Sequence, residues 1–196
     1  GDDADNDSAS TQMSSTSVVH FGVSDGDSAN SPSAAPASAS ATPAATTEPD
    51  ASQMKALSDF QAQVLQRVND VRASGTTCGG VNAPAVPALR WNAALEKAAK
   101  KHSQDMATNN YFSHTSKDGR TFAQRITAAG YSYRLAAENI AAGQQSVDSV
   151  MKGWLASAGH CRNIMLAGAK DIGVAVVRTT HADFPTYWTM DLASPR

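Results

Sequence analysis

The stretch that decides the fold lies near the C-terminus and reads Ile172-Gly173-Val174-Ala175-Val176-Val177. Both sets of alternating positions are apolar or small, which is typical of a strand covered on both faces. A second strand-like run follows, Thr186-Tyr187-Trp188-Thr189-Met190-Asp191-Leu192. Because only a short connection separates the two runs, we expect an antiparallel hairpin. A third strand is expected around Glu138-Asn139-Ile140.

Upstream of these strands, apolar side chains recur at helical spacing. The spacing predicts four amphipathic helices, within residues 57–75, 91–106, 121–130 and 146–154. We expect Ser146 to cap the last of these helices. The helices come early in the sequence and the strands come late, and one strand is covered on both faces. This arrangement predicts an α+β domain built in layers.

Charge divides the chain of 196 residues into two unlike parts. Residues 1–50 hold 8 of the 18 acidic residues and none of the 16 basic ones, so they carry −8 while the remainder carries +6. In the same 50 residues, 30 are Ser, Ala, Thr or Pro, and so little apolar surface cannot offset the entropy cost of ordering the backbone. We therefore predict a disordered acidic tether over residues 1–50 and one folded domain over residues 51–196.

The location of the protein is suggested by the same composition. The sequence has no run of 18 apolar residues that could span a membrane. An acidic leader rich in Ser, Ala and Pro before a compact domain is typical of a surface tether, so we expect an exported protein that is extracellular, periplasmic or held at the cell surface. The charge of +6 on the domain is too modest and dispersed to predict nucleic-acid binding.

The chain has two cysteines, Cys78 and Cys161, without a C-x-x-C spacing. An even number in a chain with the character of an exported protein favours one disulfide. The alternative is a pair of free, buried thiols.

Candidate chemistry is carried by two histidines and one carboxylate. His114 and His160 each follow small or turn-forming residues, which places them on loops at the rim of the domain. His102 lies on an apolar helical stripe and is interpreted as a hydrogen-bonded core histidine. Glu138 lies in an apolar setting where an unpaired charge would be costly. Two His and one carboxylate are a ligand set for zinc-like ions, but backbone partners for Glu138 and two unrelated surface histidines explain the residues equally well.

A series of short motifs follows in a fixed order along the chain: Leu65-x-x-x-Asn69-x-x-Arg72, Trp91-Asn92-x-x-Leu95, Ala98-Ala99-x-x-His102, Phe112-Ser113-His114, Gly130-Tyr131, Glu138-Asn139-Ile140-Ala141-x-Gly143, Trp154-x-x-Ser157-x-x-His160-x-x-Asn163-Ile164 and Gly173-Val174-Ala175. In this order they resemble the CAP superfamily, the cysteine-rich secretory, antigen 5 and pathogenesis-related 1 proteins, and in particular its bacterial, SCP-like branch. The resemblance covers roughly residues 57–192. It implies a three-layer α-β-α sandwich with a central antiparallel sheet.

The resemblance also implies a cavity with a His/Glu/Glu/His tetrad that holds a divalent metal such as zinc or magnesium. Its members map to His114, Glu138 and His160, and the second Glu would fall at Ser157. With Ser in that place the site has one negative charge fewer, so a metal should bind more weakly. Ser157 is three residues from His160 near a helix end, and we expect it to orient the imidazole through a hydrogen bond.

Two functions follow from the resemblance. The first is an exported, non-catalytic binding protein whose cavity takes a divalent metal or a small ligand, with lipids, sterols and proteins among the partners implied by the family. The second is a metal-assisted hydrolase, a peptidase or nuclease, with Glu138 as the candidate base. A serine hydrolase is disfavoured because no Gly-x-Ser-x-Gly elbow surrounds Ser157.

Overall fold

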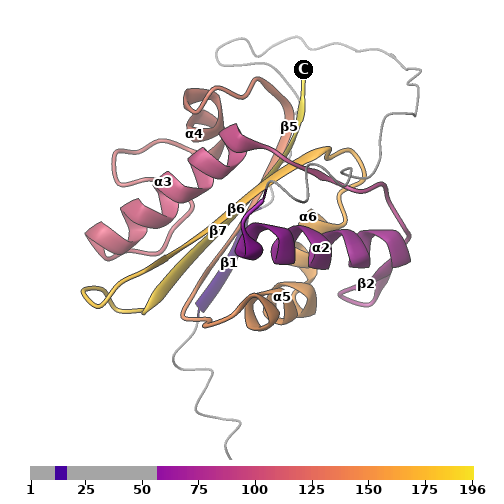
Figure 1. Cartoon of the computed structure of the whole chain (residues 1–196), viewed down its shortest axis with the longest axis horizontal. Coiled ribbons are helices and arrows are strands. Elements are labelled where there is room, and N and C mark those ends of the chain that lie inside the picture. The colour runs from indigo at the N-terminus through magenta and orange to yellow at the C-terminus, as the bar shows by residue number, and fades with distance from the viewer. Residues whose placement is uncertain (1–11, 17–56) are drawn as a thin grey trace, which may run out of the picture.

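The computed structural model describes residues 12–16 and 57–196, and its centre is a five-stranded sheet with the strand order β1-β5-β7-β6-β4 (Figure 1). The strands are β1 (Gln12–Thr16), β4 (Arg90–Trp91), β5 (Tyr133–Ala142), β6 (Asp171–Arg178) and β7 (Thr186–Pro195). Neighbouring strands are antiparallel except for the short β4, which is parallel to β6. The predicted hairpin is confirmed as β6 and β7, and β5 contains the third predicted strand.

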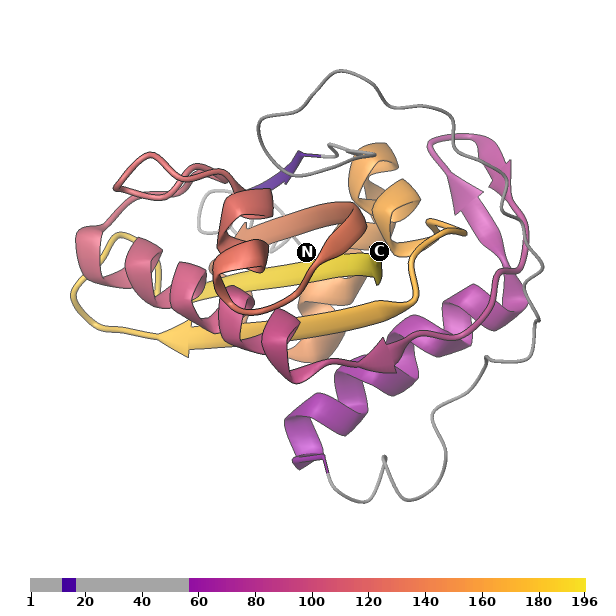
Figure 2. The same ribbon diagram turned by 90° about the horizontal axis from the view of Figure 1, so that it is seen from above.

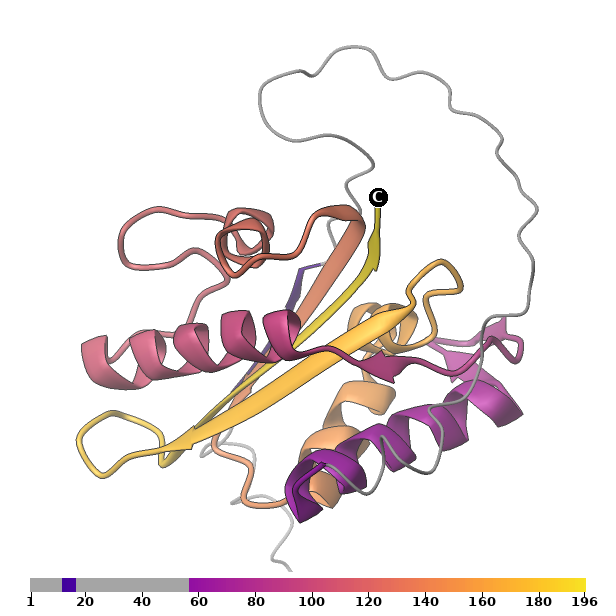
Figure 3. The ribbon, with the colours of Figure 1, turned by 45° about the horizontal axis from the view of Figure 1, so that its top comes forward.

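Helices cover both faces of this sheet (Figures 2 and 3). One face carries α3 (Ala93–Asn109) and α4 (Phe122–Ala128), and the other carries α2 (Asp59–Ser74), α5 (Val147–Ala156) and α6 (Ala158–Ile164). A small hairpin of β2 (Thr76–Cys78) and β3 (Val81–Ala83) extends from the end of α2. The three-layer α-β-α sandwich that the sequence predicted is therefore confirmed, and α6 is a helix that it did not predict.

Polar side chains fix where the helices begin. Ser58 and Thr121 each accept a hydrogen bond from the backbone N–H three residues on, in capping boxes completed by Gln61 and Gln124. Ser146 caps α5 in the same way, as predicted. These caps satisfy backbone donors that the first helical turn leaves without partners.

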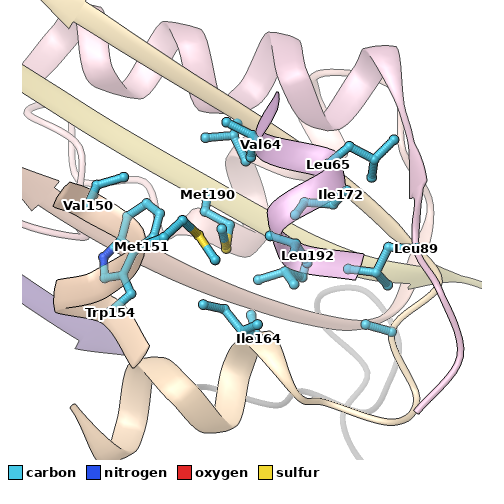
Figure 4. Close-up of a cluster of buried hydrophobic side chains, with 14 of the residues drawn as sticks. Val64, Leu65, Leu89, Val150, Met151, Trp154, Ile164, Ile172, Met190 and Leu192 are labelled. Atoms are coloured by element: carbon cyan, nitrogen blue, oxygen red, sulfur yellow. The ribbon is translucent and has the colours of Figure 1, made fainter. Parts of the chain in front are cut away.

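The larger part of the core lies between the sheet and α2, α5 and α6 (Figure 4). One of its largest side chains is Trp154, which is fully buried and donates its indole N–H to the carbonyl of Ile140 at 3.3 Å. Met190 and Leu192 of β7 pack into the same cluster. Burying a side chain as large as Trp154 is worth several kcal/mol to the folded state.

Gly173 allows α3 to lie close to the opposite face of the sheet. A Cβ at this position would meet the backbone N of Glu96 at 2.2 Å and the backbone C of Leu95 at 2.4 Å. No side chain fits in that space, so glycine in the middle of β6 is required by the approach of the helix.

A disulfide joins Cys78 of β2 to Cys161 of α6, with an S–S distance of 2.05 Å and a Cα–Cα distance of 5.4 Å. The prediction of one disulfide is confirmed. It closes a loop with a sequence separation of 83 residues, for which the chain-entropy model gives about 4.5 kcal/mol of stabilisation. It also fixes the start of α6, the helix that carries His160.

The prediction of a disordered tether is wrong for five of its residues. Gln12–Thr16 form β1, which pairs antiparallel with the outer edge of β5. The remainder of residues 1–50 lies outside the described residues.

Candidate functional site

The structure brings two of the predicted site residues together on the α3/α4 face of the sheet. Glu138 lies on β5 with no exposed surface, and His114 lies in the segment between α3 and α4. The Nδ1–H of His114 donates to Oε1 of Glu138 at 2.8 Å. The buried carboxylate therefore has an imidazole partner, which was one of the partners considered from the sequence.

The second partner of Glu138 is Arg125 of α4, which sequence reasoning missed. Its Nη2 donates to Oε2 of Glu138 at 2.6 Å, and its Nη1 donates to the His114 carbonyl at 2.6 Å and to Ser116 Oγ at 3.0 Å. Arg125 is only 4% exposed. Its position on the same helical stripe as Phe122 and Ile126 was the available signal, since an arginine on an apolar stripe needs a buried anion.

Asp191 is a third member of this cluster that was not predicted. It is the cross-strand neighbour of Glu138 in the β5–β7 pair, and it is fully buried. Burial and the negative charge of Glu138 raise the pKa of Asp191 well above its ordinary value. Both effects favour the protonated, neutral form of the Asp191 carboxyl group. No described N–H group donates to either Asp191 oxygen.

Glu138, in contrast, stays ionised. Burial alone would raise its pKa, but the charge of Arg125 and the hydrogen bonds from His114 and Asp191 outweigh burial and hold the pKa of Glu138 below its ordinary range. The two carboxyl groups thus share one negative charge between them, and that charge is compensated by one guanidinium.

His102 lies beside this cluster on α3 and has a structural role. Its Nε2–H donates to the Ser113 carbonyl at 2.7 Å, which fixes the tautomer. Burial lowers the pKa of His102 to about 4, so the ring is neutral at pH 7. The interpretation of His102 as a hydrogen-bonded core histidine is confirmed.

His160 approaches the sheet from the opposite face. It is a buried residue of α6, so the prediction of a position on a loop at the rim is wrong. Its backbone carbonyl accepts a hydrogen bond from Asn139 at 3.2 Å, and Asn139 points away from Glu138 because successive strand residues face opposite sides. The predicted bond to Ser157 is confirmed, with 2.8 Å between Ser157 Oγ and His160 Nδ1.

The donor groups do not fit a divalent cation as they stand. One oxygen of Glu138 accepts from His114 and the other from the cationic Arg125, and Nδ1 of His160 is bonded to Ser157. In the part of the chain that the structure describes, no group of three His, Cys, Asp or Glu side chains is arranged to hold a metal ion. A metal ion at Glu138 would have to compete with the cationic Arg125 for the carboxylate.

A cavity of about 310 Å³ lies next to the buried cluster. It is lined by Lys101, His102, Asp105, Ser116, Lys117, Asp118, Arg120 and Arg125. Four basic and two acidic side chains contribute to this wall, and Arg125 connects it to Glu138. The residues that line the cavity therefore carry an excess of positive charge.

An antiparallel sheet between two helical layers, with a buried carboxylate held by His and Arg, defines a small α-β-α sandwich domain of the SCP type. The chain belongs to the CAP family, described as the cysteine-rich secretory protein family, whose family model matches residues 65–192. The resemblance that the motifs indicated is thus confirmed.

The relatives agree with this assignment. The chain is 32% identical over 150 residues to the uncharacterized protein YkwD of Bacillus subtilis, an alignment that covers 76% of this chain and 53% of YkwD. The chain therefore spans about half the length of that relative. It is similar to an extracellular SCP-domain protein of Bacillus anthracis, with 25% identity, a TM-score of 0.52, and coverage of 76% of this chain and 45% of that one. It shares its fold with an outer surface protein of Borrelia burgdorferi, with 22% identity, a TM-score of 0.56, and coverage of 68% of this chain and 91% of that one.

Proposed function

We propose that this protein is an exported, non-catalytic CAP domain that binds a small anionic ligand in the cavity beside its buried charge cluster. The observation that carries the proposal is that both carboxylate oxygens of Glu138 are already hydrogen-bonded, one to His114 and one to Arg125. The side chain also has no exposed surface. A general base must reach the proton that it removes. Glu138 is instead a structural anion that holds Arg125 at the wall of the cavity.

The choice of ligand rests on the lining of the cavity. Its volume suits a molecule smaller than a typical drug. The lining has three basic side chains besides Arg125, on Lys101, Lys117 and Arg120, but only two acidic ones, on Asp105 and Asp118. A small carboxylate or phosphate compound satisfies such a wall. Lipid or sterol binding stays a prediction, and the charged side chains that line this cavity favour a small anion instead.

Export is supported by the disulfide between Cys78 and Cys161, since such bonds persist in oxidising compartments. The similar protein of Bacillus anthracis is described as extracellular and that of Borrelia as an outer surface protein. Among the described residues, none of the helices has the length and apolar character needed to cross a membrane.

Calorimetric titration with inorganic phosphate, acetate and citrate tests the ligand class. Lys101→Ala should weaken binding of the best anion at least tenfold, whereas Lys100→Ala, an exposed neighbour on α3 that does not line the cavity, should leave it unchanged. Equal losses in both variants, or no binding of any anion, would contradict the proposal.

The hydrolase alternative is tested separately. Incubation with a panel of peptides, esters and nucleic acids should give no turnover. Turnover that disappears with EDTA and in Glu138→Gln would overturn the non-catalytic assignment.

Divalent-metal binding by His114, Glu138 and His160 also stays a prediction. Zinc titration of the wild type and of a His114→Ala, His160→Ala double variant decides it. A clear loss of zinc affinity in the double variant would establish the site, and equal affinities would exclude it.

A further inference from the structure

Two side chains that line the cavity each hold a buried nitrogen without a hydrogen-bond partner among the described residues. These nitrogens are Nδ1 of His102 and Nε of Arg125. His102 has no exposed surface and Arg125 is 4% exposed. Buried polar groups in folded proteins are almost always hydrogen-bonded, so each of these atoms needs an explanation. Because both residues line one cavity, a group that enters the cavity can supply both missing partners.

The two nitrogens have opposite hydrogen-bonding roles. Nε of Arg125 carries an N–H and part of the guanidinium charge, so it can only donate. The ring of His102 is neutral at pH 7, and its Nε2–H donates to the Ser113 carbonyl at 2.7 Å. Its Nδ1 therefore holds a lone pair and can only accept. The wall thus combines a cationic donor with a neutral acceptor.

The acidic side chains of the wall, in contrast, already accept hydrogen bonds. Both oxygens of Asp105 accept from groups close to it in the sequence. Both oxygens of Asp118 accept from the guanidinium of Arg120. His102 therefore brings to the cavity an acceptor that no donor in the described part of the chain occupies.

We propose that the cavity selects a small anion that carries its own hydroxyl group, such as hydrogen phosphate or a hydroxy acid. The negative charge lies against the Nε–H of Arg125, and the hydroxyl donates to Nδ1 of His102. This inference rests on the proposed function, because it requires that the cavity binds an anion. An anion without a hydroxyl leaves the His102 nitrogen buried and unpaired, so it binds more weakly.

Calorimetric titration of the full chain with two matched pairs of anions tests this selectivity. Hydrogen phosphate and sulfate are both tetrahedral, but sulfate carries no proton at pH 7, and lactate differs from propionate by one hydroxyl. In at least one pair the hydroxyl-bearing anion should bind about tenfold more tightly, and that pair identifies the source of the hydroxyl. Equal affinities within both pairs would overturn the inference but leave the proposed function intact. If none of the anions binds, both are wrong.

Substitutions of His102 separate the roles of its two ring nitrogens. His102→Gln can keep the hydrogen bond to the Ser113 carbonyl but has no acceptor in the place of Nδ1. The preference for the hydroxyl-bearing anion should therefore disappear, while affinity for its hydroxyl-free counterpart stays unchanged. His102→Asn, whose Oδ1 can take the place of Nδ1, should keep the preference.

The matched control is Ser103→Ala, since Ser103 is a buried neighbour of His102 on α3 that does not line the cavity. This change removes the hydrogen bond between Ser103 and Thr189 and should leave the preference as in the wild type. If His102→Gln weakens both members of a pair equally, His102 only shapes the cavity and the inference is wrong.

Discussion

The two faces of the sheet hold the fold together by different means. On the face toward α2, α5 and α6, a large apolar cluster surrounds the amide of Asn139, which accepts from Asn163 at 2.9 Å. The buried guanidinium of Arg72 on this face donates to backbone carbonyls rather than to a carboxylate. On the face toward α3 and α4, the same strand β5 presents the ionised Glu138 to Arg125. Neighbouring residues of one strand thus lie in an apolar core and in a charge cluster.

The difference teaches that stability on the two faces should respond to different conditions. Apolar burial does not depend on pH. A buried ion pair is stabilising only while both partners are present and charged. Substitutions on the two faces should therefore change the free energy of unfolding by different amounts and with a different dependence on pH.

The largest effect is expected for Trp154→Ala on the apolar face. Removing this fully buried ring should lower the free energy of unfolding by about 4 kcal/mol, since it leaves a cavity and removes the hydrogen bond to Ile140. Urea unfolding at pH 5 and pH 8 should give the same loss. A loss that differs strongly between the two pH values would contradict the assignment of Trp154 to a purely apolar environment.

A somewhat smaller effect is expected for Arg125→Met on the charged face. At pH 7 it should cost about 3 kcal/mol because Glu138 is left as a buried anion without its cation. Adding Glu138→Gln should recover most of that loss. Arg120→Ala, which removes an exposed arginine paired with Asp118, is the matched control and should change stability little.

The pH dependence of the same pair gives a second measurement. In the wild type the pKa of Glu138 is lowered on folding, so its stabilisation is present above the unfolded pKa of about 4.3 and is lost as the pH falls toward the folded value. In Arg125→Met, burial raises the pKa of Glu138 instead, so the variant should gain stability relative to the wild type on acidification. Parallel pH profiles would show that Arg125 does not hold the charge of Glu138.

Periodicity made most of the fold predictable, and its failures have physical causes. Three long apolar stripes and the strand pair were found because each repeats for at least two turns or several alternations. The short α4 was found from Phe122 and Ile126, one turn apart, before Gly130. Helix α6 has only seven residues and begins with Ala158-Gly159, so no stripe develops. Strand β1 was missed because the composition of fifty residues was averaged, and a single apolar residue such as Met13 disappears in that average.

The site was predictable only in part. Glu138 and His114 were found, but Arg125 and Asp191 were not, because the groups that they face are distant in the sequence. Their pairing depends on the β5–β7 register and on how α4 packs, and neither is visible in local sequence. His160 was assigned to the same cavity by resemblance, although its carbonyl lies on the far face of β5.

The smallest effect is expected for Asp191→Asn, and it is a gain. Asp191 is neutral in the folded state because burial and Glu138 raise its pKa, whereas in the unfolded chain it ionises above about pH 4. Its contribution to stability is therefore present below the unfolded pKa and is lost as the pH rises toward the raised folded pKa. Asparagine does not ionise and its amide can still donate to Glu138, so the variant should match the wild type near pH 4.

At pH 7 the same variant should be more stable than the wild type, and the difference should widen as the pH rises above the unfolded pKa of Asp. Urea unfolding at pH 4, 5.5 and 7 measures the divergence. A variant that loses stability equally at all three values would show that Asp191 is ionised in the folded protein. The charged face would then hold two buried anions beside one guanidinium. The second negative charge, and not the ion pair between Glu138 and Arg125, would then be the main difference between the two faces.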